Sequence, residues 1–178
     1  LQFYFEETLF MILNWCKHFL EELEQELPKH NNSILETFKA ITPTREKEYR
    51  SETYSVRGFV DAIRFVGDDV YIIDYKTNSK PEIKDSIKLQ LAIYCLLYEE
   101  EHGHLPKKVG VFFLREKLQM LDVDVSMVER AKREIAQIHA HTSSTENEKD
   151  YTQTVTGLCK WRTGQCDFYD TCRPHNRY

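Results

Sequence analysis

The segment "VYIIDYKTNSK", residues 70–80, ends an apolar run with an acid and a base two residues apart. Side chains alternate faces along a strand, so Asp74 and Lys76 point to one side and Tyr75 to the other. The preceding segment, "GFVDAIRFV" at residues 58–66, carries Asp61. If the two segments form a hairpin around the turn at residues 67–69, Asp61 and Asp74 approach each other at the end away from that turn.

Two neighbouring carboxylates repel each other, and a divalent cation between them removes the repulsion. Hard oxygen ligands that leave several waters on the ion are typical of a Mg²⁺ or Mn²⁺ site. The ammonium group of Lys76 cannot bind the metal, but it can orient or deprotonate a water or neutralise charge on a phosphate. The set therefore favours hydrolysis of a phosphodiester. The alternative is an exposed acid–base pair, since Asp-x-Lys alone is common by chance.

The elements that must position these residues follow from the apolar pattern. Helical spacing predicts helices at residues 4–26, 31–41, 85–103 and 125–139. Asp85 is the expected cap of the third helix, and Gly103 is expected to end it. Alternation and β-branched residues predict strands at residues 46–56, 58–66, 70–76, 107–115 and 118–123. The expected fold is an α/β sandwich with a central mixed sheet flanked by helices and followed by a cysteine-rich tail.

Composition restricts the class of protein. A chain of 178 residues is one domain with room for a small appendage. Because it opens on Leu1 rather than Met, a further N-terminal element is allowed for. No apolar run is long enough to cross a bilayer, so no membrane partner is expected. The net charge of −5 argues against nucleic-acid binding by bulk electrostatics, although it permits a local basic groove.

Five cysteines are an odd number, and three of them crowd the C-terminus. This is a poor disulfide framework and is more typical of a metal site in a reducing compartment. We therefore expect an intracellular, cytoplasmic protein, or one of the host cytoplasm if the source is viral. The C-terminal thiols are Cys159, Cys166 and Cys172, interleaved with aromatic residues. Thiolates are soft ligands for zinc or iron–sulphur clusters.

Three motifs in order, Gly58-x-x-Asp61, Asp74-Tyr75-Lys76 and Gln90-x-x-x-Tyr94, resemble the PD-(D/E)XK nuclease superfamily of the RecB type. That group includes the CRISPR-associated iron–sulphur exonucleases and the AddB nuclease domain. The resemblance implies a restriction-endonuclease-like fold with a nuclease core at residues 1–141. Within it, residues 1–42 would be a helical part and 43–124 the catalytic sheet and helix. Residues 142–178 would be a metal-cluster tail packed on the core.

The resemblance also implies the roles of individual residues. Asp61 and Asp74 would be metal ligands with the Tyr75 carbonyl as a third, and Lys76 would be the catalytic lysine. Gln90 and Tyr94, four apart on one helix face, would lie beside the active site and the nucleic-acid strand. Core packing is an equal alternative for Tyr94.

The family usually supplies a further metal ligand from an N-terminal helix, and His18 is the candidate here. A lone helical histidine is more often structural or exposed. Glu48 resembles an acid with a supporting role in the first strand. In the tail, the resemblance implies a structural [4Fe-4S] cluster held by Cys159, Cys166 and Cys172, with Cys16 as the candidate fourth ligand. A zinc site completed by His175 is the alternative, because the spacing alone does not decide.

The expected function is that of a Mg²⁺- or Mn²⁺-dependent DNA exonuclease acting on single strands or duplex ends, in a process such as DNA repair. Basic residues in "SKPEIK" could line the path of the strand. A helicase or another nucleic-acid-processing protein is an expected partner. The alternative function is a non-catalytic nucleic-acid-binding or complex-forming module on the same fold. A zinc deaminase is remote, because no His-x-Glu accompanies a Cys-x-x-Cys.

Overall fold

The computed structural model describes residues 2–78 and 80–172, and the chain divides into two compact units, residues 1–136 and 137–178. The first unit contains a five-stranded sheet with the order β1-β2-β3-β4-β5. Its strands are β1 (Thr44–Ser51), β2 (Val56–Val66), β3 (Asp69–Lys76), β4 (Lys108–Phe113) and β5 (Leu118–Asp122). Neighbouring strands are antiparallel except β3 and β4, which are parallel. The predicted mixed sheet is therefore confirmed.

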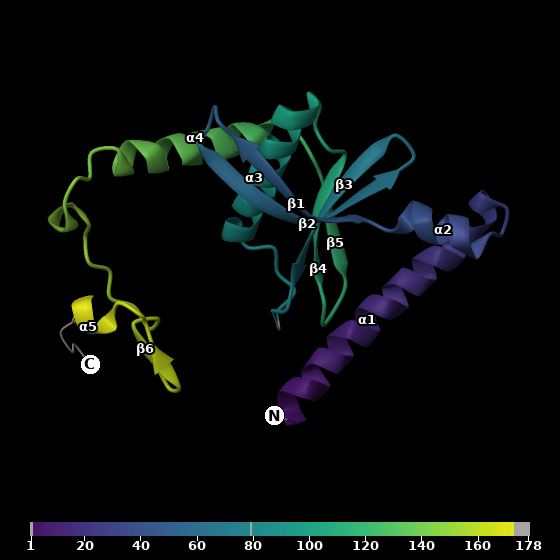
Figure 1. Cartoon of the computed structure of the whole chain (residues 1–178), viewed down its shortest axis with the longest axis horizontal. Coiled ribbons are helices and arrows are strands. Elements are labelled where there is room, and N and C mark those ends of the chain that lie inside the picture. The colour runs from purple at the N-terminus through teal and green to yellow at the C-terminus, as the bar shows by residue number, and fades with distance from the viewer. Residues whose placement is uncertain (1, 79, 173–178) are drawn as a thin grey trace. The chain divides into compact units, whose positions relative to one another are not determined.

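The helices are α1 (Gln2–Glu26), the 3-10 helix η1 (Leu27–His30), α2 (Ile34–Ile41), α3 (Asp85–His102) and α4 (Val125–Thr142). Figure 1 shows the twisted sheet between α3 and α1. Because side chains alternate along each strand, the sheet has two apolar faces. Ile72 and Val111 pack in the core with Leu91 of α3, whereas Ile73 and Phe112 pack with Trp15 of α1. The predicted α/β architecture with helices on both faces is confirmed.

The crossover from β3 to the parallel strand β4 contains α3, the most buried helix of the first unit. Eight of its residues are buried. Gly103 ends it in a left-handed conformation (φ 76°) and donates its backbone N–H to Glu99, as predicted. The predicted cap was wrong: Lys84 occupies the N-cap position without a side-chain cap bond, and Asp85 lies in the first turn. There its charge still favours the positive end of the helix dipole.

The first strand ends earlier than predicted, at Ser51 rather than at residue 56. Ser51 Oγ accepts a hydrogen bond of 2.9 Å from the backbone N–H of Tyr54, and Ser55 has a positive φ of 49°. A serine that bonds the backbone locally competes with the strand ladder, so a tight turn replaces the last predicted strand residues.

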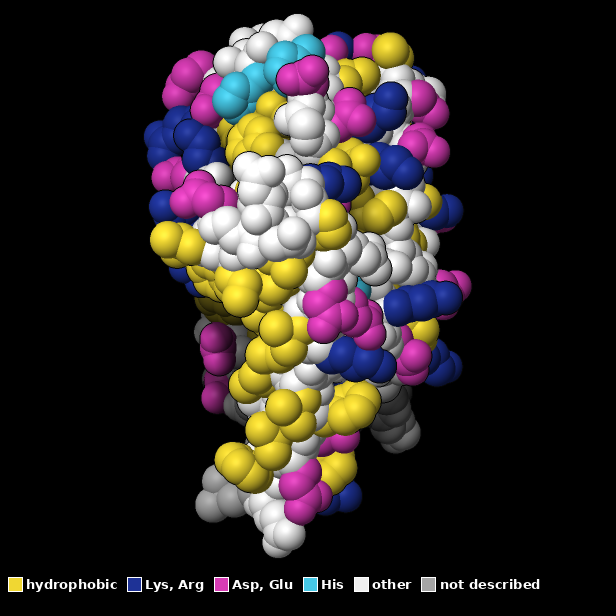
Figure 2. All heavy atoms as spheres, turned by 90° about the vertical axis from the view of Figure 1, so that its right-hand side faces the viewer, with side chains coloured by type: hydrophobic (Ala, Val, Ile, Leu, Met, Phe, Trp, Pro, Cys, Tyr) yellow, Lys and Arg dark blue, Asp and Glu magenta, His cyan; other side chains and the backbone are white. Residues whose placement is uncertain are grey.

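α1 has a long apolar surface that the rest of the first unit leaves exposed. Figure 2 shows hydrophobic side chains along this face of the molecule. Those of α1 include Phe3, Phe5, Phe10 and Leu13, each at least 55% exposed. The helix is attached near its middle, where Asn14 Nδ2 donates to the carbonyl oxygen of Leu114.

The second unit is built from short elements. They are the 3-10 helix η2 (Glu148–Asp150), the two-stranded sheet of β6 (Lys160–Trp161) and β7 (Gly164–Gln165), and α5 (Tyr169–Cys172). The boundary between the units falls within α4. Across residues 2–78 and 80–172, no helix is both long and apolar enough to cross a membrane.

Candidate active site

The hairpin of β2 and β3 brings Asp61 and Asp74 to the same end of the sheet. The antiparallel register runs from Val66↔Asp69 to Ala62↔Ile73, so the two aspartates follow directly where the ladder ends. Instead of continuing the ladder, the backbone N–H of Tyr75 donates to Asp61 Oδ2 at 2.9 Å. This places the Asp61 carboxylate beside the Asp74-Tyr75-Lys76 backbone, as the sequence predicted for these strands.

Asp74 is the most deeply buried charged residue of the described chain, with 1% of its surface exposed. Lys76 Nζ lies 2.8 Å from Asp74 Oδ2 as an ion pair, but the geometry does not meet that of a hydrogen bond. Burial raises the pKa of Asp74 above its ordinary value, the Lys76 ammonium group lowers it, and the charge of Asp61 raises it again. The net direction is upward because the desolvation of the carboxylate is the largest effect.

Gln90 connects the lysine to the aspartate from α3. Its Oε1 accepts from Lys76 Nζ at 3.0 Å, and its Nε2 donates to Asp74 Oδ1 at 3.0 Å and to Tyr94 Oη at 2.8 Å. An ammonium group only donates and a carboxylate only accepts, so this network fixes which end of the amide faces which partner. Gln90 therefore holds Lys76 and Asp74 in one geometry.

Tyr94 completes the network one helical turn after Gln90. Burial, helped by the charges of Asp74 and Asp61, raises the pKa of Tyr94, so its hydroxyl keeps its proton. Its ring packs over Gly58 of β2, where an added Cβ would lie 3.5 Å from Tyr94 Cε1 and 3.2 Å from Leu97 Cδ1. The glycine of the first motif thus leaves room for the helix that carries Gln90 and Tyr94.

The arrangement of oxygens fits a hard divalent cation. Asp74 Oδ2 is buried, with the Lys76 ammonium group 2.8 Å away and no hydrogen bond of good geometry from the described residues, and a carboxylate oxygen can accept more than one partner. A cation bound there and at Asp61 satisfies it with the ligand type that Mg²⁺ and Mn²⁺ prefer. Within residues 2–78 and 80–172, no three His, Cys, Asp or Glu side chains converge as a metal site. Such an ion would therefore complete its coordination with backbone oxygen and water, and the Tyr75 carbonyl stays the predicted third ligand.

The structure does not bring His18 to the aspartates. The His18 ring lies against Phe112, with ring centroids 4.9 Å apart, and Phe112 packs with Ile73 on the α1 face of the sheet. Asp74, next to Ile73 in the strand, faces α3 and Gln90. The expectation that His18 joins this metal site is therefore corrected, because the sheet separates the two. Glu48 is exposed on β1 and pairs with Arg50.

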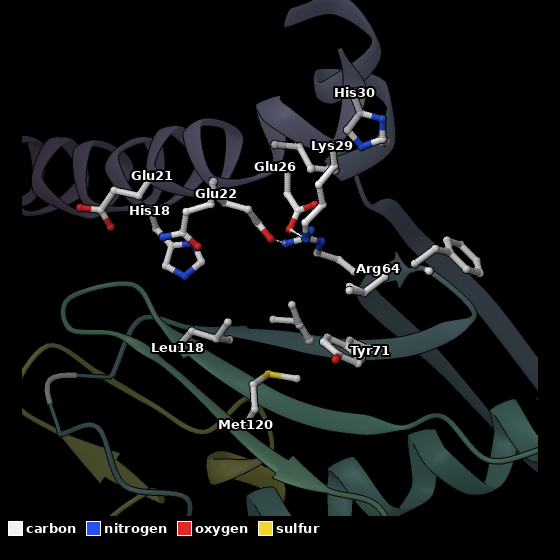
Figure 3. A pocket seen from close by; sticks show the side chains of 17 residues that line it. His18, Glu21, Glu22, Glu26, Lys29, His30, Arg64, Tyr71, Leu118 and Met120 are labelled. Atoms are coloured by element: carbon white, nitrogen blue, oxygen red, sulfur yellow. Dashed lines mark hydrogen bonds and ion pairs between the residues drawn. The ribbon is translucent and has the colours of Figure 1, made fainter. Parts of the chain in front are cut away.

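His18 instead lines a cavity of about 630 Å³ beneath α1 and η1. Figure 3 shows its ring directed from α1 toward the sheet, with Leu118 and Met120 on the floor and Arg64 paired with Glu22 at the side. The Asp61, Asp74 and Lys76 side chains do not line this cavity. The Asp74 and Lys76 side chains thus lie on the other face of the sheet, beside Gln90 of α3.

Trp15 is a supporting residue that the sequence analysis missed. Its Nε1 donates to Tyr75 Oη at 3.3 Å, so α1 fixes the residue between Asp74 and Lys76 from behind. Nothing in the local sequence pattern predicts this contact, because a tryptophan at helical spacing is typical of core packing. The bond joins residues sixty positions apart and depends on how the helix meets the sheet.

The cysteines occupy two kinds of environment. Cys95 is buried in the core, and burial followed by the charge of Glu99 raises the pKa of its thiol to about 12. In the second unit, the backbone N–H of Cys166 donates to the Cys159 carbonyl at 3.0 Å, and Cys172 Sγ accepts from Gln153 Nε2 at 2.9 Å.

The cluster itself stays a prediction. Cys159 and Cys166 are partly exposed and Cys172 is exposed, and all three thiols are free. Cys16 is a partly buried residue of α1. His175, the alternative zinc ligand, lies outside the described residues.

Comparison with known proteins adds independent information. A family model of the PD-(D/E)XK nuclease superfamily matches residues 4–173. A curated relative from Francisella tularensis subsp. novicida (strain U112), the CRISPR-associated exonuclease Cas4, is 26% identical over 125 residues. That match covers 69% of this chain and 59% of the relative, so the chain spans about three fifths of the relative's length. A crystal structure of a proposed exonuclease from Eubacterium rectale matches with a TM-score of 0.41 and 16% identity, over 79% of this chain and 55% of that chain.

Proposed function

The chain belongs to the PD-(D/E)XK nuclease superfamily, and from that premise we propose that it is a Mg²⁺- or Mn²⁺-dependent deoxyribonuclease. We further propose that it acts as an exonuclease on single strands or duplex ends. The observation that carries the proposal is the bonded set of Asp74, Lys76 and Gln90 beside the Asp61 carboxylate. A nuclease of this family needs acids for a metal and a lysine held next to them, and the first unit supplies both.

In this proposal Asp61 and Asp74 hold the ion, together with the Tyr75 carbonyl. When bound, a divalent ion polarises the phosphate and makes a water acidic enough to act as the nucleophile. The protein's own contribution is to hold the Asp61 and Asp74 carboxylates at one end of the β2–β3 hairpin, with Asp61 fixed by the Tyr75 backbone and Asp74 by Gln90.

Lys76 has one donor to spare for the reaction. An ammonium group carries three N–H bonds, of which one points to Gln90 Oε1 and one lies toward Asp74 Oδ2. The third is available to a phosphate oxygen or to the attacking water. Because Gln90 and Asp74 fix the amine, Lys76 stabilises negative charge that develops on the phosphate without reorganising during the step.

For the second unit we propose that Cys159, Cys166 and Cys172 hold a structural [4Fe-4S] cluster with Cys16, with a zinc site that includes His175 as the alternative. The chemistry of the donors supports a soft metal or cluster, since three of the five cysteines of the chain lie in this part of the sequence. Five free cysteines also support a reducing, intracellular location.

The direct test incubates the protein with 5′- and 3′-labelled oligodeoxynucleotides, single-stranded and duplex, in Mg²⁺ or Mn²⁺. Asp74→Ala and Lys76→Ala should each abolish degradation while the folded state is kept. Asp122→Ala and Lys108→Ala are matched controls, because these residues form an ion pair of 3.6 Å far more exposed than the Asp74–Lys76 pair. Full activity in either site variant would refute the proposal. Tight binding of DNA with no turnover in any metal would instead favour a non-catalytic module.

A further inference from the structure

The segment at residues 80–84 joins the two parts of the proposed active site. It follows the strand that ends in Lys76 and leads into α3, which carries Gln90. Two successive backbone bonds of 3.0 Å, from Glu82 to Lys80 and from Lys84 to Glu82, give the segment a defined course. Ile83 packs against the main core, so the segment is anchored from within.

Gln119 anchors the same segment from the sheet. Its side-chain Nε2 donates to the carbonyl oxygen of Pro81 at 2.8 Å, across 38 residues of sequence. Asp74 pairs with Val111 in β4, and Val111 pairs with Gln119 in β5, so the three residues form one row across the sheet. Gln119 lies two β-strand spacings, or about 10 Å, from Asp74. This distance corresponds to one or two nucleotides of an extended nucleic-acid strand.

The charges on this segment differ from those around it. Lys80 and Lys84 are exposed, and neither forms an ion pair with a described residue. Lys76 and Lys88, on either side, are paired with Asp74 and Asp85. With the exposed Glu82 between them, residues 80–84 carry a net charge of +1. Two unpaired ammonium groups beside the proposed active site still favour a polyanion, because their binding releases counterions from its phosphates.

Building on the proposed function, we infer that residues 80–84 hold the nucleic-acid backbone next to the cleaved phosphate. Lys80 and Lys84 bind phosphates of the single strand, and Gln119 is a positioning residue that acts through Pro81. In the proposed function Asp61 and Asp74 would hold the metal and Lys76 would serve the reaction, whereas this segment sets affinity. The affinity for nucleic acid can therefore be measured separately from turnover.

The first experiment measures the Kd for a fluorescent single-stranded oligodeoxynucleotide in EDTA, so that hydrolysis does not occur, at several salt concentrations. Lys80→Ala and Lys84→Ala should each weaken binding about three- to tenfold and reduce the slope of log Kd against log salt by about 0.7, the value for one phosphate contact in a single strand. Lys17→Ala is the control, because Lys17 lies on α1 and pairs with Glu21. An unchanged slope in both segment variants would overturn the inference.

The second experiment asks whether Gln119 acts through the segment. Gln119→Met keeps an unbranched side chain of similar length but removes the donor, and it should raise Kd about threefold. In the double variant with Lys80→Ala, Gln119→Met should raise Kd by a smaller factor than it does alone, because both changes disturb the same contact. Fully additive effects, or a wild-type Kd in Gln119→Met, would remove Gln119 from the account. If binding behaves as predicted and wild-type protein still cleaves nothing in Mg²⁺ or Mn²⁺, the proposed function fails and the binding segment stands.

Discussion

Among the residues of the candidate site, Asp74 is the one whose charge is least favourable to the folded state. Its carboxylate is buried, lies near Asp61, and is only partly compensated by Lys76. Such a group weakens the folded state when charged, and a bound cation removes that cost. Under the proposed function, metal binding and the stability of the metal-free protein are thus opposed at this side chain, and such shifted pKa values are common at catalytic positions.

Asp74→Asn should abolish hydrolysis yet stabilise the metal-free protein. The pKa of Asp74 is raised in the folded state, so the stability linked to its proton is present at low pH and is lost as pH rises through the raised pKa. Asparagine mimics the neutral form and avoids that loss. In EDTA at pH 7 we expect a Tm increase of about 2–4 °C, or about 1 kcal/mol, that shrinks toward pH 4. Thermal melts from pH 4 to 8 measure it, and a variant less stable than wild type at every pH would contradict the account.

The elements of the core could be predicted because their signals are local. The alternating run around Asp61, the turn at Gly67 and the acid–base end of "VYIIDYK" specify a hairpin, and its register then places both aspartates together. The helix with Gln90 was equally visible, with Gly103 as its end.

The placement of α1 could not be predicted in the same way. In its N-terminal half, apolar residues such as Phe3, Tyr4, Phe5 and Phe10 follow one another too closely to lie on one side, so periodicity does not show which side meets the sheet. Asn14 and Trp15 decide the orientation through bonds to Leu114 and Tyr75, both distant in sequence. That orientation turns His18 toward Phe112 and away from the aspartates.

The close packing of β4 on β5 leads to a prediction for Gly110 of β4. A Cβ added at Gly110 would lie 2.3 Å from the Gln119 carbonyl oxygen and 2.5 Å from Met120 Sδ, so the two strands must separate. Gly110→Ala should lower the free energy of unfolding by about 2–3 kcal/mol in urea titrations. Gly58→Ala is the comparison and should cost less, about 1 kcal/mol, since the nearest atom to its added Cβ is Leu97 Cδ1 at 3.2 Å and no backbone atom lies closer. The reverse order of the two losses would show that this pairing is looser than described.

For the whole molecule, the second unit has little apolar core of its own. It consists of short elements, and large side chains such as Leu158 and Phe168 are more than 70% exposed. A segment with so small a core is stable only with a bound metal, a disulfide or a partner surface. The sequence predicted its ligands, but neither spacing nor fold identifies the metal.

Cys159→Ser should therefore change metal content more than nuclease chemistry. We expect purified wild-type protein to be brown and to contain iron, and the variant to lose most of the iron together with thermal stability of the tail. Elemental analysis and visible absorbance measure this, with Cys95→Ala as the control because that thiol is buried in the core. Colourless wild-type protein with stoichiometric zinc would select the alternative site, and full iron content in Cys159→Ser would exclude Cys159 as a ligand.

The central claim is that Asp61 and Asp74 together bind the divalent ion that Lys76 serves. Electron paramagnetic resonance of Mn²⁺ titrated into the protein tests it without requiring the correct substrate. The account predicts that Asp61→Asn and Asp74→Asn each weaken Mn²⁺ binding about tenfold or more, whereas Asp122→Asn at an exposed position leaves it unchanged. Wild-type Mn²⁺ affinity in both site variants would contradict the account, whatever nuclease activity the protein shows.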